Sequence, residues 1–488
     1  MSAEVFWMIA RALDDPKDLH RLLHVNRRLF KIATPLRYAS IRIDSYLTLD
    51  RAAPMYTIQK NADRTSIYRS APKRVEIGGP PDAPQWKYER AFRVLRTLTA
   101  VRSLYVWHLP SFPYDMLAHW ISSIGTLKTL EVKSPAVRDF MPRYYTPILP
   151  PTFPSLTRVH FVNFQWGTIA NTLDQSISSL ALLSSISTIR SFCADVRSWI
   201  SMSRGRWCDR LSFPPNVSEL EIVVGPECHM EDMQNEAWAR GLFRALRVCG
   251  SKLESLRIQL PYQTRTILNT RIPLPRLTIF VGPEGILYSV DLDGPLTVLW
   301  ITSCAFDMEP DVAPWVTVWP TLRDPGALRM LRVASWDLRA LNIAAVLSEL
   351  PELEELSIFT KTRLDKTELV SLGKAFARCP RLWKVTVLGP SGSMQPLKSV
   401  AEIAAAWQGV APSLGCVRLS TTEKWYLQYD WDEQVFVWEP KSVSFPRGYK
   451  QIDLPSHLKP CSLQIPPYPD RIRYPDSDTE YETGSESE

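Results

Sequence analysis

The amino-acid sequence predicts an α/β solenoid of about twelve irregular units, and three observations support this fold class. From Val101 onward an apolar-x-x-apolar-x-apolar pattern returns along the chain, and its final alternation indicates a short strand with one buried face. Helical periodicity separates several of these strands. Prolines often stand where a helix would have to end before the next strand begins.

The strand pattern covers most of the 488 residues. Ten clear copies begin at Val101, Leu127, Leu156, Val217, Leu253, Leu296, Leu328, Leu353, Leu382 and Leu414. Two weaker copies begin at Ile189 and Leu277. The starts lie 19 to 36 residues apart, so the units differ in length but keep one strand motif.

Helices are predicted between several strands. Val400, Ile403, Ala404 and Trp407 fall at i, i+3, i+4 and i+7, which places them on one helical face. The segments 343–350 and 369–379 have a similar periodicity. Prolines that mark the turn back to the sheet are Pro154, Pro275, Pro351, Pro380 and Pro412.

A helix, a proline turn and a strand at a period near 28 residues form the unit of a leucine-rich-repeat solenoid. Each unit buries its apolar residues only against its neighbours. The Asn of the pattern LxxLxLxxN/C is mostly absent, although Asn163 and Cys304 stand near its place, so the predicted array is irregular. A doubly wound α/β domain also alternates strands and helices, but twelve copies of one strand motif favour the solenoid.

The first 43 residues predict three short amphipathic helices. The first helix precedes an Asp15-Pro16 break, where Asp15 suits an N-cap and Pro16 the first helical position. The third helix is expected to end at Thr34-Pro35. A bundle of about 40 residues is near the lower limit for a core of its own, so it should lean on the rest of the chain or on a partner.

This N-terminal segment resembles an F-box. The matching residues are Glu4, Val5, Phe6, Ile9, Leu13, Asp15-Pro16, Leu19, Leu22, Val25, Arg28 and Phe30. The resemblance implies docking onto a Skp-type adaptor, which joins such proteins to a cullin ubiquitin ligase. It assigns adaptor binding to Val5, Phe6, Ile9, Leu13, Pro16, Leu19, Leu22, Val25 and Phe30. One departure is Met1-Ser2, which stands where the family has Leu-Pro.

Five regions follow along the chain. Residues 1–43 form the F-box-like helical domain, and the Pro-rich residues 44–100 serve as a connector and N-terminal cap. Residues 101–424 form the repeat solenoid. Two alternating aromatic runs between Trp425 and Trp438 predict a hairpin, so residues 425–465 are expected to cap the open end of the last unit. Residues 466–488 are Pro-rich, then acidic, and are expected to be disordered.

Composition narrows the class of protein. No run of 18 apolar residues and no secretory signal occurs. Eight scattered cysteines without a CxxC favour an intracellular protein, cytoplasmic or nuclear, with free thiols. The net charge is +6, and residues 474–488 hold six acids and no base, so the rest of the chain carries +12. No run of five or more basic residues occurs, so nucleic-acid binding is not predicted.

Enzymatic and cofactor motifs are not recognisable. Cys228-His229 is the closest Cys/His pair, and no other ligand stands at a zinc-site spacing. Asp291-Leu292-Asp293-Gly294 has part of a calcium loop but lacks its later ligands. No phosphate-binding glycine loop or GxSxG motif is formed. The prediction is therefore a binding protein with no catalytic residue, metal or cofactor, and an enzyme is the least favoured class.

An F-box followed by leucine-rich repeats resembles the F-box/leucine-rich-repeat substrate receptors of Skp-cullin-F-box ubiquitin ligases. The resemblance implies that the F-box holds the adaptor and the repeats hold a protein substrate, while no nucleic acid or membrane is bound. The alternative is a repeat scaffold without a ligase role, in which the N-terminal helices only cap the array.

The strand alternation predicts which side chains face outward on the sheet. They are Tyr105, Trp107, Glu131, Lys133, Arg158, His160, Glu219, Glu221, Arg257, Trp300, Arg332, Phe359, Lys384 and Arg418. Aromatic and Arg side chains most often anchor interfaces. Trp300, Arg332 and Phe359 are therefore the predicted substrate-binding patch, and Tyr105 and Trp107 form a second candidate pair.

Overall fold

The computed structural model describes the chain in segments. They are residues 3–13, 16–43, 62–78, 97–107, 124–133, 155–166, 186–199, 213–224, 236–259, 271–287, 289–302, 322, 324–336, 343–360, 364–389, 397–420, 423–430, 435–442, 450–451 and 464–465. The acidic C-terminal residues 466–488 lie outside these segments, so their predicted disorder stays a prediction.

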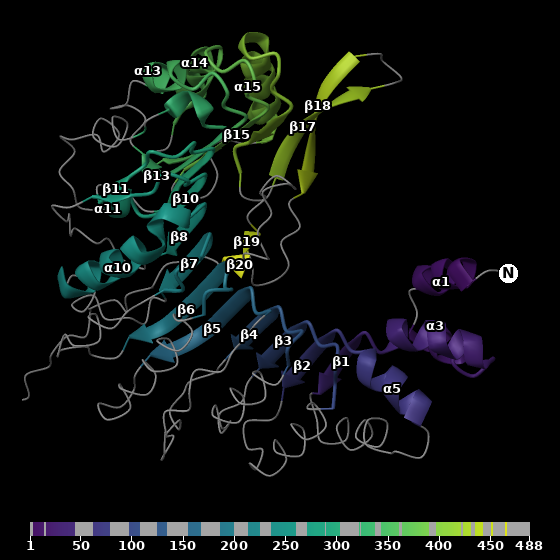
Figure 1. Cartoon of the computed structure of the whole chain (residues 1–488). Helices are drawn as coiled ribbons and strands as arrows, with labels where there is room; N and C mark the ends of the chain where they lie inside the picture. The colour runs from purple at the N-terminus through teal and green to yellow at the C-terminus, as the bar shows by residue number, and fades with distance from the viewer. Residues whose placement is uncertain are drawn as a thin grey trace, which may run out of the picture.

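One 16-stranded sheet follows the chain and bends into an arc (Figure 1). Its parallel strands are β1 (Ser40–Ile43), β2 (Arg74–Gly78), β3 (Ser103–Trp107), β4 (Thr129–Lys133), β5 (Arg158–Trp166), β6 (Ser191–Trp199), β7 (Glu219–Val224), β8 (Ser255–Gln259), β10 (Ile279–Gly282), β12 (Val298–Ile301), β13 (Met330–Trp336), β14 (Glu355–Thr360), β15 (Lys384–Leu388) and β16 (Cys416–Arg418). Neighbouring strands follow chain order. A doubly wound sheet reverses its order at a switch point. This sheet does not, so the architecture is α/β and compatible with a solenoid.

The register of the sheet is set by one backbone pattern that repeats at each parallel step. The carbonyl oxygen of the residue before each strand accepts two hydrogen bonds from the neighbouring strand. One comes from the N–H of the residue before that strand, and the other from the N–H of its first residue. At the first step the Ala39 carbonyl accepts from Lys73 N at 2.8 Å and from Arg74 N at 2.9 Å. The pattern recurs at every step as far as the Trp383 carbonyl, and we call this series the carbonyl spine. Each step involves only adjacent strands, so units of unequal length stack in one register.

The apolar residues of the strand motif form one continuous core. Each of the twelve sequence patterns lies on a strand, and the residue that starts each pattern is buried. In β3, for example, Leu104 and Val106 are buried while Tyr105 between them is partly exposed. The apolar positions of the pattern are therefore buried as predicted wherever their side chains are described, including Phe192 in β6 and Phe280 in β10, while β8, β14 and β15 also bury the residues between them.

The sheet begins earlier in the chain than the sequence indicated. β1 and β2 lie ahead of Val101, and both pair in parallel within the same sheet. Val75 and Ile77 of β2 are buried in the common core. The residue that starts the motif ahead of β2 is Pro72, three residues before Val75, and it is also buried. A proline in place of the usual Leu hides the apolar pattern, which explains why these strands were assigned to a connector.

Helices cover the outer side of the arc (Figure 1). They are α10 (Glu236–Cys249), α11 (Glu284–Leu287), α13 (Ile343–Ser348), α14 (Lys366–Phe376) and α15 (Leu397–Val410), with 3-10 turns at Gly250–Lys252 and Pro325–Ala327. The three helices predicted near residues 343, 369 and 400 are confirmed as α13, α14 and α15. Asp365 begins α14 with a capping box, because its side chain accepts from Glu368 N at 2.7 Å and its own N–H donates to Glu368 at 2.8 Å.

Three N-terminal helices stand at one end of the arc, α1 (Ala3–Ala12), α2 (Pro16–Leu22) and α3 (Arg27–Arg37). Asn26 caps α3, since its side chain accepts from Leu29 N at 2.9 Å. The expected end of this helix at Thr34-Pro35 is wrong, because α3 includes Pro35 and continues to Arg37. The Thr34 carbonyl accepts from Tyr38 N at 3.0 Å, so the last turn closes in spite of the proline.

The helical unit packs against α5 (Ala62–Ser70). Phe30 lies edge-on to Tyr68 with ring centroids 5.6 Å apart, and Leu23 and Ala33 complete a small core. Tyr68 also packs against the main core of the sheet. The bundle therefore leans on the chain, as its small size predicts.

The C-terminal end of the sheet closes with the predicted hairpin. β17 (Glu423–Asp430) pairs antiparallel with β16 and with β18 (Val435–Ser442). Trp438 Nε1 donates to Gln408 Oε1 of α15 at 3.2 Å, and Trp425 packs against the core. The hairpin thus covers the edge of the last parallel strand. Two small pairs are separate from the main sheet: β9 (Ile272–Pro273) with β11 (Val290–Asp291), and β19 (Lys450–Gln451) with β20 (Gln464–Ile465).

The segment Asp291–Gly294 has a structural role. Asp291 lies 3.5 Å from Arg271 Nη1 as an ion pair, and the turn at Gly294 packs on the backbone of Leu277. A Cβ at Gly294 would lie 2.6 Å from both the N and the O of Leu277. Only glycine fits this turn, which accounts for the motif without a bound ion.

Gly294→Ala is expected to lower the free energy of unfolding by about 1–3 kcal/mol, because the added methyl overlaps backbone atoms that cannot rotate away. Urea denaturation measures this change. Gly409→Ala is the matched control, since a Cβ there meets nothing within 4 Å and alanine favours its helix. Equal midpoints for Gly294→Ala and the unchanged chain would contradict the steric argument.

No helix in the described part of the chain is both long enough and apolar enough to cross a membrane.

Candidate functional site

The outward-facing side chains form a row across the inner side of the arc. Strand register places Tyr105 opposite Glu131, Glu131 opposite His160, and Trp300 opposite Arg332. A partner lying along this row would cross the strands and touch one side chain from each. Where the structure describes their side chains, the residues predicted to face outward are at least partly exposed, except Arg257, which is buried. The side chains of Trp107 and Lys133 lie outside the described residues.

Trp300, Arg332 and Phe359 come together, as the sequence predicted. The Arg332 guanidinium carbon lies 4.4 Å from the ring centroid of Trp300 and 5.8 Å from that of Phe359. Trp300 and Arg332 are direct cross-strand neighbours, and Phe359 is diagonal to them on β14. All three are partly exposed. Aromatic faces that flank a guanidinium hold it in one orientation and contribute about 0.5–1 kcal/mol each at exposed sites.

Other residues of the same face are buried to different degrees. Arg257 is only 5 % exposed and Ser357 only 7 %. Val298 and Met330 form an apolar pair that is also buried. Among these buried neighbours, Trp300, Arg332 and Phe359 stay partly exposed.

In the second candidate pair, Tyr105 and Trp107, only the side chain of Tyr105 is described. The Arg74 guanidinium lies 4.2 Å from the ring centroid of Tyr105 and pairs with Glu76 at 2.7 Å. Tyr105 is thus covered on one face by a cation of its own chain. This arrangement makes Tyr105 a poorer anchor than the residues around Arg332.

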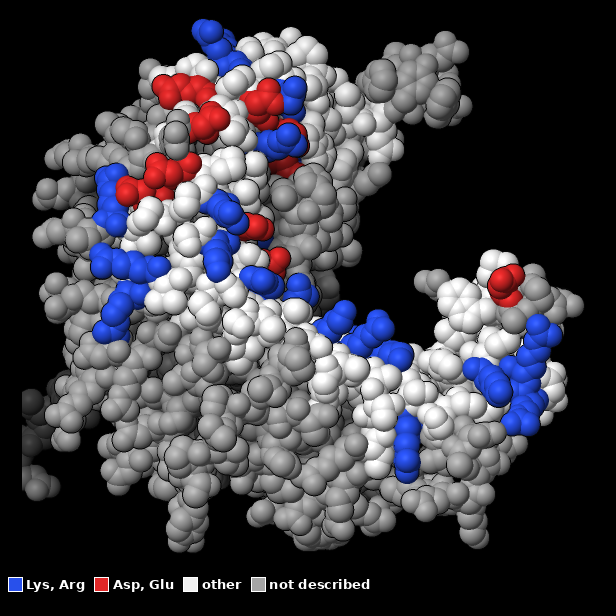
Figure 2. Space-filling view, in the orientation of Figure 1, with Lys and Arg blue, Asp and Glu red and all other residues white. Residues whose placement is uncertain are grey.

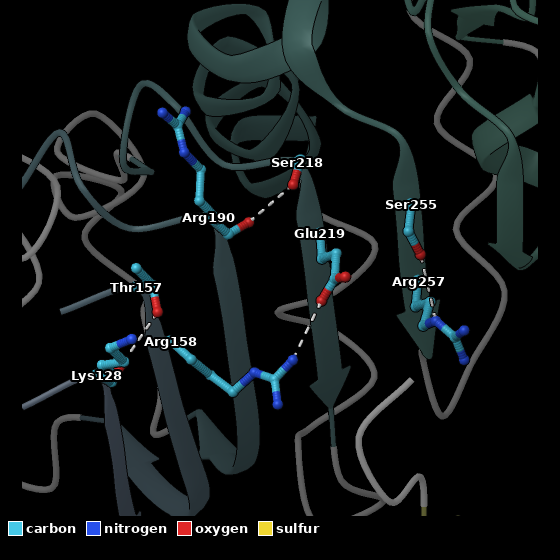
Figure 3. Close-up of polar contacts among 8 residues, drawn as sticks. All are labelled: Lys128, Thr157, Arg158, Arg190, Ser218, Glu219, Ser255 and Arg257. Atoms are coloured by element: carbon cyan, nitrogen blue, oxygen red, sulfur yellow. Dashed lines mark hydrogen bonds and ion pairs between the residues drawn. The ribbon is translucent and has the colours of Figure 1, made fainter. Parts of the chain in front are cut away.

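Charged contacts link neighbouring strands of this face. His160 Nδ1 lies 3.6 Å from Glu131, and Lys384 Nζ lies 2.7 Å from Glu355. Figure 3 shows Arg158 reaching across β6 toward Glu219, with 3.9 Å between their charged atoms. These pairs fix side-chain positions across the sheet, so they stabilise a surface rather than hold a reactive group.

A separate apolar surface lies on the N-terminal helices. Trp7 is 43 % exposed, Met8 58 % and Val25 63 %. Among the residues that the resemblance assigns to adaptor binding, Phe6, Leu13, Leu19 and Leu22 are partly exposed. We call the exposed set Trp7, Met8 and Val25 the helical apolar surface. Large apolar side chains exposed on one small helical unit are candidates for an interaction site.

The remaining positions that the resemblance assigns to adaptor binding are either buried or have side chains that the structure does not describe. Phe30 is 8 % exposed and packs against Tyr68, so it belongs to the core of the helical unit and not to its surface. The side chains of Val5, Ile9 and Pro16 lie outside the described residues. Trp7 and Met8 were missed by the sequence reasoning because they fall off the predicted apolar face, and a Trp beside that face was the available signal.

The buried cysteines are unsuited to chemistry. Burial raises the pKa of the Cys249 and Cys379 thiols to about 12, so both stay protonated at neutral pH. Each is buried completely, and Cys379 Sγ lies 3.5 Å from the Leu347 carbonyl. These thiols fill the core. In the described segments no three His, Cys, Asp or Glu side chains gather to hold a metal, and Cys228-His229 lies outside those segments.

Alanine at Trp300, Arg332 and Phe359 together is expected to weaken capture of a bound protein by about 2 kcal/mol or more, because buried aromatic and Arg anchors dominate interfaces. The measurement compares proteins recovered from native-cell extract by the tagged chain and by the triple variant. Trp383→Ala is the control, since Trp383 is an exposed aromatic at the edge of the same sheet. Unchanged recovery would show that these three residues do not bind the captured protein. Loss of folding would show that they belong to the core.

No model of a known protein family matches this chain, and a search of curated proteins found no similar sequence.

Proposed function

We propose that this protein is the substrate-recognition subunit of a cullin-type ubiquitin ligase, in which an F-box binds a Skp-type adaptor and a leucine-rich-repeat face binds a protein substrate. The observation that carries the proposal is the helical apolar surface. It lies on α1 and on the turn between α2 and α3, within the unit of short helices that carries the F-box-like residues, next to an arc-shaped sheet. The chain itself supplies binding, and transfer of ubiquitin takes place on other subunits.

The separation of the two surfaces supports one role for the helices, adaptor binding, and another for the sheet, substrate binding. The N-terminal helices stand at one end of the arc, while Trp300, Arg332 and Phe359 lie many strands away along the sheet (Figure 1). An adaptor on the helices would therefore leave the inner face open. Partly exposed aromatic and charged side chains along the inner face favour a surface that binds another chain.

The second candidate is a repeat scaffold without a ligase role. The contact of Phe30 with Tyr68 favours it, because it shows that the helices also cover one end of the sheet. In this function the helices are a cap, and the apolar groups that they expose have no adaptor.

Co-expression with a Skp-type adaptor tests the proposal. The ligase function predicts that the full chain and the adaptor co-purify through size-exclusion chromatography as a stable complex. The scaffold function predicts two separate peaks. Separate peaks from a chain that is folded by circular dichroism would reject the proposed function.

A further inference from the structure

Two histidines meet at the end of the second N-terminal helix. In the turn that follows α2, Leu23 N donates to the His20 carbonyl and His24 N donates to the Arg21 carbonyl, each at 3.1 Å. Residues four apart in such a coil lie on the same side. The Nε2 atoms of His20 and His24 are 3.4 Å apart, and their ring centroids are 4.8 Å apart. We call these two residues the histidine pair.

The turn is fixed on one side and open on the other. Leu23, which stands between the two histidines, is buried in the small core of the helical unit. Both histidine side chains are exposed. The buried leucine therefore holds the turn against the helices, while the two rings stand at the surface, where a small ion can reach them.

The distance between the two Nε2 atoms suits a shared zinc ion better than a hydrogen bond. Hydrogen bonds from N–H groups span about 2.7–3.2 Å, so 3.4 Å makes a long one. A zinc ion lies about 2.0–2.1 Å from each histidine nitrogen, and the tetrahedral angle then separates the two nitrogens by about 3.3–3.4 Å. The separation within the histidine pair matches this span.

The type of ligand and the distance together select the metal. Imidazole nitrogen suits zinc, copper, nickel and iron, whereas calcium and magnesium take oxygen ligands. The right angles of octahedral and square-planar sites would bring two histidine nitrogens to about 2.8–3.0 Å. Because the histidine pair is wider than this, its geometry favours tetrahedral zinc over copper(II) and nickel(II).

A tetrahedral ion on the histidine pair would keep two positions for other ligands, because in the described segments no third His, Cys, Asp or Glu gathers with the two rings. Figure 2 shows blue side chains gathered on the N-terminal helices. The exposed cations nearest in sequence are Lys17, Arg21, Arg27 and Arg28, and Arg21 pairs with Asp18 at 2.8 Å. These positive surroundings favour an anion, such as a carboxylate, as the third ligand.

We propose that His20 and His24 form a zinc-binding site on the surface of the helical unit. Each Nε2 supplies one ligand, and water or a carboxylate of a partner protein supplies the others. His24 directly precedes Val25 of the helical apolar surface, so a protein that covers Val25 would stand beside the ion. The site does not depend on the ligase role, because the histidine pair binds the ion with or without a partner.

Protection of single histidines from chemical modification tests this site in the full, untagged chain. Diethyl pyrocarbonate reacts with free imidazole nitrogen, and peptide mass spectrometry gives the rate at each histidine. Zinc should slow modification of His20 and His24, because a nitrogen bound to metal is shielded. In His20→Gln, the zinc concentration that half-protects His24 is expected to rise about tenfold or more, since one of two protein ligands is lost.

His160 is the internal control, because it lies on β5 and its rate should be the same with and without zinc. Calcium should protect neither histidine of the pair, since it prefers oxygen ligands. The glutamine variant should keep the circular dichroism of the unchanged chain, because His20 is exposed. Equal protection of His24 in the unchanged chain and in His20→Gln, or equal protection of His160, would overturn the site.

Discussion

Trp407→Ala is expected to lower the free energy of unfolding by about 3–5 kcal/mol, the largest loss of stability for a single residue in this fold. Trp407 lies on α15, where it is completely buried and packs against α14. Its Nε1 donates to the Leu369 carbonyl at 2.7 Å, and its ring lies edge-on to Phe376 with centroids 5.0 Å apart. Alanine would leave a cavity that these fixed helices cannot close.

Gly373 shows how closely this site is filled. Any Cβ at Gly373 would overlap the Trp407 ring, so the helix leaves room for the indole by having no side chain there. Thermal unfolding followed by circular dichroism measures the loss, and hydrogen exchange locates it in α14 and α15. Trp383→Ala is the control, because Trp383 is 41 % exposed. A change in the transition no larger than that of the control would contradict the packing argument.

Met8→Glu with Val25→Glu is expected to abolish capture of a Skp-type adaptor, if the adaptor covers the helical apolar surface. A carboxylate buried in an interface without a partner costs about 3–5 kcal/mol, and two such charges cost about as much as the whole binding free energy of a micromolar complex, about 8 kcal/mol. Both residues are more than half exposed, so the charges remain in water when the chain is alone. Recovery of adaptor in a pull-down is the measurement.

Val248→Glu with Val410→Glu is the matched control, since these valines are also exposed but lie on the solenoid helices. This control should keep the adaptor. Retention of the adaptor by the Met8/Val25 variant would place the contact elsewhere. Phe30→Glu would be a poor variant for this purpose, because Phe30 is core and its loss would unfold the helices.

The sheet could be predicted from sequence because its signal is local. An apolar residue every second position, preceded by a Leu three residues earlier, places Leu104 or Leu356 inside regardless of what surrounds the strand. Helices such as α15 follow from the same reasoning at a period of 3.6. The outward direction of Trp300 and Arg332 then comes from the pleat, and their contact from the register between neighbouring strands.

The remaining features depend on contacts that no local pattern encodes. β2 was missed because Pro72 stands at the place of the usual Leu. The continuation of α3 beyond Pro35 depends on the closing bond from Tyr38 N. The exposure of Trp7 and the burial of Phe30 depend on how the helices dock on α5.

The carbonyl spine has a consequence for how this chain can change over generations. The duplication or the loss of one whole unit, from one spine residue to the next, would leave every spine carbonyl with two N–H donors from the neighbouring strand. The difference in unit length, from 19 to 36 residues, shows that insertions within a unit leave the joints unchanged. Such a sheet tolerates recombination at spine residues such as Arg102 and Arg329, whereas a cut inside a strand would break the register on both sides.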